Sequence, residues 1–155
     1  MDGTKTQNVI ACVTGNDKLQ VFQEVLEHSD FFQNIEERLK GSGKDRQLFK
    51  IVIKPNFMVF LTSKDPSSHT DPELVDFLVR GLLERGFREI YVVESQNVLG
   101  KWYHNRDVLT VASACGYKNI GYRLVDLTQE AVLHSFDGVL VPLRESTTSW
   151  KECQV

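Results

Sequence analysis

The sequence predicts an α/β fold with a three-layer, Rossmann-like arrangement, in which helices cover a mainly parallel, doubly wound sheet. Short apolar runs rich in β-branched residues, typical of strands buried on both faces, alternate with longer segments of helical periodicity. Their order is β-α-β-α-β-α-β-(α)-β, and strands that are joined by helical crossovers pair in parallel. The length of 155 residues suits one such domain.

The N-terminal part predicts one strand and two helical segments. Residues 8–13 form an apolar run that indicates a strand, and residues 14–17 indicate a turn and a helix cap. Apolar residues at helical spacing then predict a helix from Lys18, an interruption at residues 29–30, and a second helix closed by residues 41–43.

Two predicted strands, at residues 48–53 and 90–93, flank the clearest helix in the sequence. Thr70 or Asp71 caps that helix, and Gly86 supplies its left-handed stop.

The C-terminal part continues the alternation. We expect a helix that begins after Asp107 and ends at Gly116, a strand at residues 122–127, a short helix at 128–133 and a last strand at 139–141.

Composition excludes several classes of protein. The net charge of −3 gives no basic field for nucleic acid or an anionic membrane. Neither a secretory signal nor a membrane-length apolar run is present, so a cytoplasmic location is expected. Cys12, Cys115 and Cys153 are far apart and odd in number, which indicates reduced thiols, at least two of them buried, rather than disulfides or a metal centre.

Lys54 and Glu94 are the sharpest pair of candidate residues, and we assign them as the candidate catalytic residues. Each directly follows a buried strand and begins a loop longer than a typical connection, at the edge where open α/β sheets bind ligands. An unpaired charge there is costly. One interpretation is an ion pair that joins adjacent strand ends; another is an anion or carbonyl site on Lys54, with Glu94 as orienter or base. The two can coexist.

The same two loops carry further candidates. Asn56 would help Lys54 to hold an anion, and the helix start at Thr70 would add backbone donors. A histidine before that helix could contact a phosphate or simply be solvated, and the aromatic cluster at 102–106 could stack on a planar ligand or anchor its own loop. The candidate ligand-binding residues are Asn56, His69, Thr70, Ser95, His104 and Arg106.

Familiar cofactor motifs are missing. Residues 41–44 lack the spacing of a P-loop, and residues 14–17 lack the glycines of a dinucleotide site. The four histidines show no metal-ligand spacing, and no nucleophile elbow is present. The sequence therefore predicts no metal, and the cofactor stays unknown.

Three segments carry a family resemblance: IVIKPN at residues 51–56, HTDPELV at 69–75 and EIYVVES at 89–95. In order and spacing the chain resembles the domain of unknown function 362 family, over roughly residues 49–150. Further segments that fit are Arg106-Asp107-Val108, Gly116-Tyr117 and Val125-Asp126-Leu127.

The resemblance implies an α/β protein whose biochemical role is largely unassigned. Some members carry an added ferredoxin-like region with four-iron clusters, whose cysteine motif this sequence lacks. Similar proteins continue past a tryptophan segment like residues 149–153 into a second conserved part, whose lysine and histidine motifs complete the site. Residues 1–155 are thus expected to be a single α/β domain, either the N-terminal part of a longer family domain or a naturally short member.

Two functions follow as hypotheses. The first is binding of a small anionic or carbonyl-bearing ligand at the carboxyl ends of the strands, with any reaction left open. The alternative is a non-catalytic accessory module that self-associates as a homo-oligomer, or pairs with a missing second half, through residues 57–61. Neither hypothesis includes nucleic acid or membrane as a partner.

Overall fold

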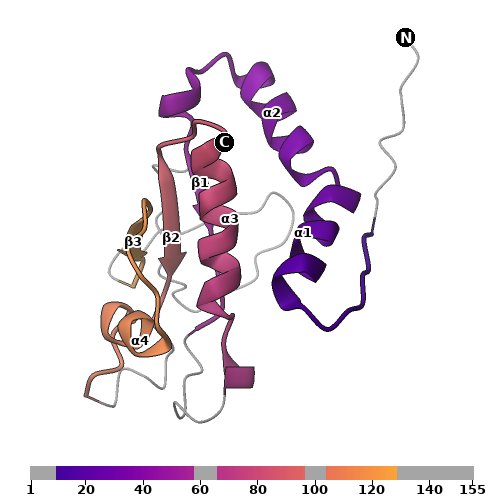
Figure 1. Ribbon diagram of the computed structural model, residues 1–155. Helices are drawn as coiled ribbons and strands as arrows, with labels where there is room; N and C mark the ends of the chain where they lie inside the picture. Colours follow the sequence, from indigo (N-terminus) through magenta and orange to yellow (C-terminus); the bar gives the residue numbers. More distant parts are fainter. Residues whose placement is uncertain (1–9, 58–65, 97–103, 129–155) are drawn as a thin grey trace, which may run out of the picture. The chain divides into compact units, whose positions relative to one another are not determined.

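The computed structural model describes residues 10–57, 66–96 and 104–128. Its contacts divide the chain into two compact units, Met1–Asp45 and Arg46–Val155. Figure 1 shows the elements in chain order. That the two units form a single domain stays a prediction.

The first unit contains a pair of helices, α1 (Lys18–His28) and α2 (Phe31–Ser42). The Asp17 carboxylate caps α1 by accepting hydrogen bonds from two backbone N–H groups of its first turn. Asp30, with a φ of 51°, turns the chain between the helices, and Gly43, with a φ of 64°, ends α2. The two predicted helices and the break between them are therefore confirmed.

The strand predicted at residues 8–13 is wrong for its described part. Ile10–Val13 adopts no regular secondary structure, and Ile10 is 92% exposed. A strand needs a neighbour to pair with, and a short apolar run does not reveal whether one is present. The expectation of two buried cysteines is also wrong, because Cys12 is exposed and Cys115 is half-buried, both as free thiols.

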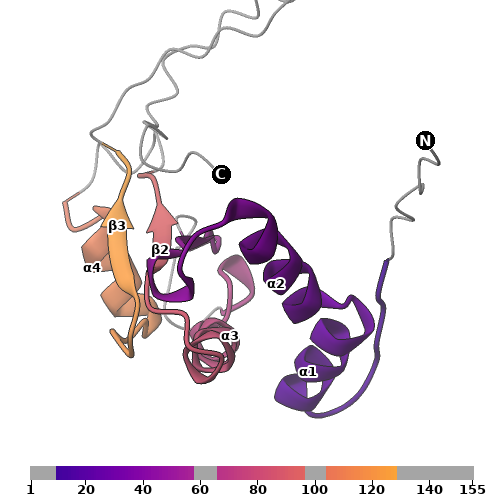
Figure 2. The same ribbon diagram turned by 90° about the horizontal axis from the view of Figure 1, so that it is seen from above.

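The second unit holds a three-stranded parallel sheet in the order β1-β2-β3. Its strands are β1 (Ile51–Ile53), β2 (Ile90–Glu94) and β3 (Arg123–Asp126). Two helices connect them, α3 (Pro72–Glu84) and α4 (Val108–Cys115). In Figures 1 and 2, α3 lies along one face of the sheet. This unit is α/β and Rossmann-like, which confirms the predicted fold class.

Strand order and strand length differ in detail from the expectation. The described strands follow one another in chain order, so no reversal of strand order lies among them. The strand predicted at residues 48–53 begins only at Ile51, because the 3₁₀ turn η1 (Arg46–Leu48) precedes it and leaves Leu48 68% exposed. The helix predicted at 128–133, beyond its first residue, and the strand at 139–141 lie outside the described residues.

Helix α3 has the strongest amphipathic pattern, and its apolar stripe forms one side of the core. Val75, Val79 and Leu82 are buried on this helix. The Asp71 carboxylate caps its start, and Gly86, with a φ of 88°, follows its end. The other core residues of this unit are Phe57, Phe87, Ile90, Val92, Val93, Val108, Val111, Ala112 and Tyr122.

Helix α4 begins and ends where the sequence predicts. The Asp107 carboxylate accepts a hydrogen bond from the N–H of Thr110, and Gly116 adopts a left-handed φ of 96°. None of the helices in the described ranges combines the length and the apolar character that crossing a membrane requires. The 3₁₀ turn η2 (Pro66–Ser68) stands shortly before α3.

Candidate functional site

The ends of β1 and β2 bring Lys54 and Glu94 together. Ile53 lies opposite Val92 in the parallel register, so both strands end at the same edge of the sheet. The Lys54 Nζ atom lies 3.1 Å from Glu94 Oε2 and donates a hydrogen bond to it. The ion pair that the sequence allowed as one interpretation is therefore present.

The two partners differ in exposure, and this difference decides what the pair can do. The Glu94 side chain is only 5% exposed, whereas that of Lys54 is 56% exposed. The second carboxylate oxygen of Glu94 accepts a hydrogen bond from the Ser95 N–H at 2.9 Å. Lys54 makes only the Glu94 hydrogen bond within the described part of the chain, and an ammonium group has three donors. Two donors of the Lys54 ammonium group therefore remain for a ligand, while the buried Glu94 carboxylate holds this group in place.

The third strand adds a second carboxylate to the same edge. Asp126 lies opposite Glu94 in the parallel register, so both side chains leave the sheet on the same face. Asp126 Oδ1 accepts hydrogen bonds from the N–H of Thr128, at 2.8 Å, and from its hydroxyl group. We name Lys54, Glu94 and Asp126 together the carboxyl-end rim.

The residues predicted from the sequence do not include Asp126 or Thr128. The signal that could have found Asp126 is the one that selected Glu94, an acidic residue at the end of an apolar strand. Thr128 also accepts a hydrogen bond from the Gln96 N–H at 2.8 Å, which ties the chain after β2 to the chain after β3.

Asn56 and Thr70 hold the segment after β1 against the start of α3. The Asn56 N–H donates to Thr70 Oγ1 at 2.9 Å, and the Thr70 N–H donates to the Asn56 carbonyl at 2.5 Å. The Tyr117 hydroxyl donates to the Thr70 carbonyl at 3.0 Å, and burial raises the pKa of this phenol, which keeps it protonated. We name Asn56 and Thr70 the clasp. Their observed contacts are structural.

The start of α3 already uses several of its backbone donors. The Asp71 carboxylate accepts from the Glu73 N–H at 2.9 Å, and the Asp71 carbonyl accepts from the Leu74 N–H at 3.1 Å. Pro72 has no N–H to donate. The donors expected at this helix start are therefore engaged within the protein, and the assignment of Thr70 to a ligand stays a prediction.

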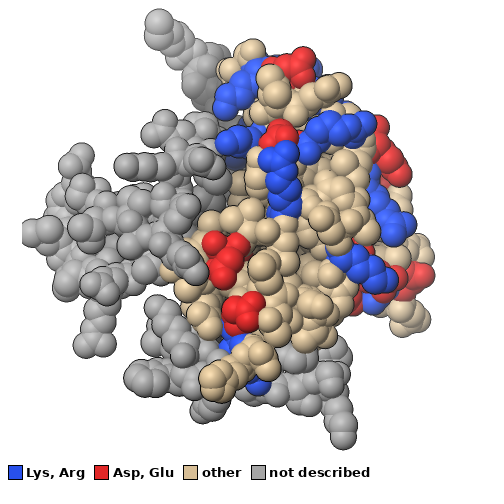
Figure 3. Space-filling model, turned by 90° about the vertical axis from the view of Figure 1, so that its left-hand side faces the viewer, with Lys and Arg blue, Asp and Glu red and all other residues tan. Residues whose placement is uncertain are grey.

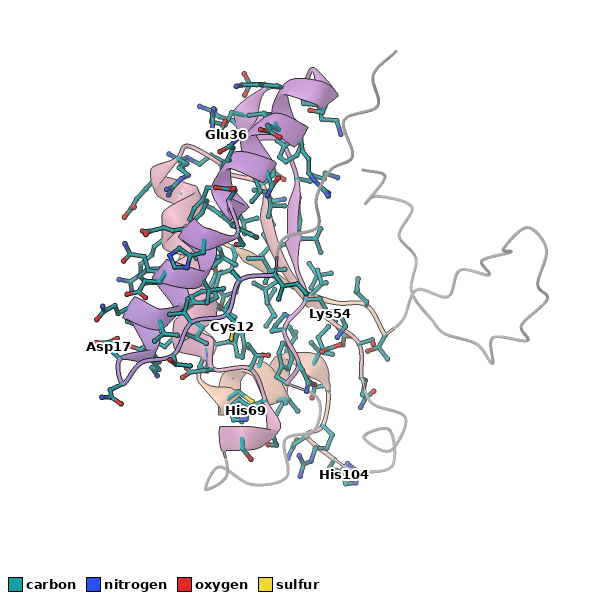
Figure 4. All side chains as sticks on the ribbon, turned by 90° about the vertical axis from the view of Figure 1, so that its right-hand side faces the viewer. Cys12, Asp17, Glu36, Lys54, His69 and His104 are labelled. Carbon is teal, nitrogen blue, oxygen red and sulfur yellow. The ribbon has the colours of Figure 1, made fainter. Side chains whose placement is uncertain are left out.

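The remaining predicted site residues lie around the rim rather than in it. His69 is half-buried and His104 is exposed, and Figure 4 shows both of them apart from Lys54 and from each other. The Arg106 carbonyl accepts a hydrogen bond from the Gln96 side chain at 3.1 Å. Of the predicted residues, the described contacts thus join Lys54, Glu94 and Ser95 into one group and Asn56 and Thr70 into another.

The apolar patch expected at residues 57–61 is corrected at its first position. Phe57 is fully buried, and its ring centroid lies 4.9 Å from that of Tyr117. Phe57 is therefore part of the core and not part of an exposed surface. Residues 58–61 lie outside the described residues, as do residues 102–103 of the predicted aromatic cluster.

Charges of both signs are spread over the described residues. Figure 3 shows basic and acidic side chains interspersed on the face at the left-hand side of Figure 1. Within the ranges that the structure describes, no three His, Cys, Asp or Glu side chains gather in a way that could hold a metal ion. The rim consists of one cation, Lys54, and two carboxylates, Glu94 and Asp126, which are groups suited to hydrogen bonding and proton exchange.

Comparison with known proteins gives a family for this chain. A family model described as a domain of unknown function (DUF362) matches residues 51–154, which includes all three strands of the sheet. No curated protein and no solved structure matches the chain. The matched segment begins at the first residue of β1 and contains every residue of the carboxyl-end rim. The chain belongs to the DUF362 family.

Proposed function

We propose that this protein binds a small ligand bearing a carboxylate, phosphate or carbonyl oxygen at the carboxyl-end rim, with Lys54 as the group that holds the oxygen. The observation that carries the proposal is the asymmetry of the Lys54–Glu94 pair, in which a buried carboxylate holds the ammonium group of a lysine side chain that is 56% exposed. An exposed lysine without such a partner is a mobile side chain that loses rotamer entropy when it binds. The ion pair with Glu94 already restricts the Lys54 side chain in the unbound protein, so less rotamer entropy is lost when a ligand binds.

Glu94 has two roles in this proposal. Its Oε2 positions the ammonium group of Lys54, while the Ser95 N–H fixes its other oxygen, so the carboxylate is held from both sides. A buried carboxylate in contact with the ligand-binding group is also the group that can exchange a proton with a bound carbonyl compound.

The proposal includes a cytoplasmic location. The free thiols of Cys12 and Cys115 support it, because cysteines remain reduced in that compartment. The alternative function, association through residues 57–61, gains no support from the buried Phe57.

Thermal-shift titration with pyruvate, malonate and inorganic phosphate tests the proposal. We expect at least one of these probes to raise the melting temperature of the wild-type protein, and Lys54→Met to abolish the shift. A ligand at about 100 times its Kd stabilises the folded state by about 2.7 kcal/mol, which a melting curve resolves easily.

Lys50→Met is the matched control. Lys50 stands one residue before β1 and Lys54 one residue after it, so both variants lose one positive charge from the same strand at opposite ends. The shift should persist in Lys50→Met. A shift that survives in Lys54→Met, or that no probe produces in the wild type, contradicts the proposal.

A further inference from the structure

We infer that Asp126 limits the charge of the ligand, so that the carboxyl-end rim prefers a neutral carbonyl compound or a monoanion to a dianion such as phosphate. This inference rests on the proposed function, and it names the class of ligand that the same site takes. It assigns to Asp126 the role of a specificity-determining residue.

The charges of the rim carry the first step. Lys54 contributes one positive charge, whereas Glu94 and Asp126 contribute two negative charges from neighbouring strands. Glu94 neutralises Lys54 at 3.1 Å, which leaves the Asp126 carboxylate as the uncompensated charge of the three. The three rim residues together therefore present one net negative charge to a ligand oxygen on Lys54, and the repulsion from that charge grows in proportion to the ligand's own charge.

The hydrogen bonds of Asp126 carry the second step. Its Oδ1 accepts two hydrogen bonds from Thr128, and neither of these donors carries a positive charge. Oδ2 makes no hydrogen bond within the residues that the structure describes, so it is an available acceptor on the strand next to that of Glu94. A hydroxyl or amide donor on the ligand would suit this oxygen, and a second anionic group would not.

Three probes of nearly equal shape separate charge from fit: malonamide, malonamate and malonate, which carry zero, one and two negative charges at pH 7.5. Their Kd values are to be measured by calorimetry on the wild type and on Asp126→Asn, in 50 mM NaCl. The variant keeps the oxygen that accepts the Thr128 hydrogen bonds and removes only the charge.

We expect Asp126→Asn to bind malonate on the order of 15-fold more tightly than the wild type and malonamate about fourfold more tightly, with malonamide nearly unchanged. The gain for the dianion should be about the square of the gain for the monoanion, because the interaction energy scales with ligand charge. Both gains should shrink in 500 mM NaCl.

Glu84→Gln is the matched control, since it removes the same charge from an exposed position at the C-terminal end of α3. It should leave all three affinities unchanged. Equal affinities of the wild type and Asp126→Asn for malonate, or equal gains in both variants, overturn the inference and leave the proposed function standing. Failure of all three probes to bind either protein overturns the inference, whereas the proposed function is removed only if pyruvate, malonate and phosphate all leave the melting temperature of the wild type unchanged.

Discussion

The two ends of the same small sheet hold different kinds of polar cluster. At the amino ends of β2 and β3, Arg123 donates two hydrogen bonds to the Glu89 carboxylate, at 3.1 and 3.2 Å, and its guanidinium carbon lies 5.4 Å from the Tyr91 ring centroid. Tyr91 also donates its hydroxyl hydrogen to Glu89. At the carboxyl ends, Lys54 makes one hydrogen bond within the described residues, to Glu94, and its side chain is 56% exposed.

The difference is between a cluster whose polar groups bond to one another and a cluster with polar groups available to a ligand. Glu89, Tyr91 and Arg123, which we name the amino-end cluster, satisfy one another through bidentate hydrogen bonding and ring contact. In the carboxyl-end rim, two Lys54 donors and one Asp126 oxygen make no hydrogen bond to any residue that the structure describes. Charged residues at strand ends can thus have different roles. The number of hydrogen-bond donors without a partner among the described residues distinguishes a structural cluster from a candidate binding site.

The largest expected effect concerns burial next to each end of the sheet. Phe57, three residues after Lys54, is fully buried, whereas the Arg123 and Glu89 side chains of the amino-end cluster are 64% and 23% exposed. Phe57→Ala should lower the free energy of unfolding by about 3–5 kcal/mol, as measured by urea denaturation, because it leaves a cavity against Tyr117.

Leu109→Ala serves as the control for that substitution, since Leu109 is an exposed apolar residue on α4. Its effect should stay within about 0.5 kcal/mol. If Phe57→Ala were as mild as Leu109→Ala and instead changed the sedimentation coefficient, the view of Phe57 as core would have to be abandoned.

A smaller effect should follow from removing the cation of the rim. Lys54→Met leaves the buried Glu94 carboxylate with only the Ser95 N–H, so we expect a loss of about 1–2 kcal/mol in the free energy of unfolding. Lys50→Met should change this quantity by no more than about 0.5 kcal/mol. Adding Glu94→Gln to Lys54→Met should recover part of the loss, and a further loss in the double variant would speak against the ion pair.

The smallest effect should be seen at the amino-end cluster, and it depends on pH. The Tyr91 hydroxyl, followed by the Arg123 charge, holds the pKa of Glu89 below its ordinary value of 4.5, against partial desolvation. A lowered folded-state pKa contributes stability above the ordinary value, and this contribution disappears as the pH falls through the folded value.

Tyr91→Phe should therefore raise the pKa of Glu89 toward 4.5, as followed by NMR titration of its carboxyl carbon. The stability difference from the wild type should be constant above about pH 6 and diminish in acid. A Glu89 pKa that is the same in both proteins would show that Arg123 alone holds the carboxylate.

Most of the helices could be predicted from the sequence because their signals are local. Asp17, Asp71 and Asp107 each cap a helix where an acidic residue precedes an apolar period, and Gly86 and Gly116 follow helix ends with positive φ. The Lys54–Glu94 pair was also predictable, since parallel strands deliver their final residues to one edge.

The misses depend on partners that lie far away in the chain. The run at Ile10–Val13 is as apolar as a strand, yet it has no pairing neighbour among the described residues. Phe57 begins an apolar run that resembles an exposed patch, and only the fold brings Tyr117 against it. Asp126 matters because its register places it beside Glu94, a relation that exists only once β2 and β3 are paired.

The clasp between Asn56 and Thr70 has a consequence for how this protein can vary. The backbone N–H groups of Asn56 and Thr70 hold these two residues together by hydrogen bonds. The end of β1 and the start of α3 are therefore in contact whatever the number of residues between Asn56 and Thr70. Lengthening a closed loop costs little, about 0.6 kcal/mol for each doubling. Insertions between Asn56 and Thr70 should therefore leave the position of Lys54 unchanged, so sequences that differ in length here can share the same ion pair.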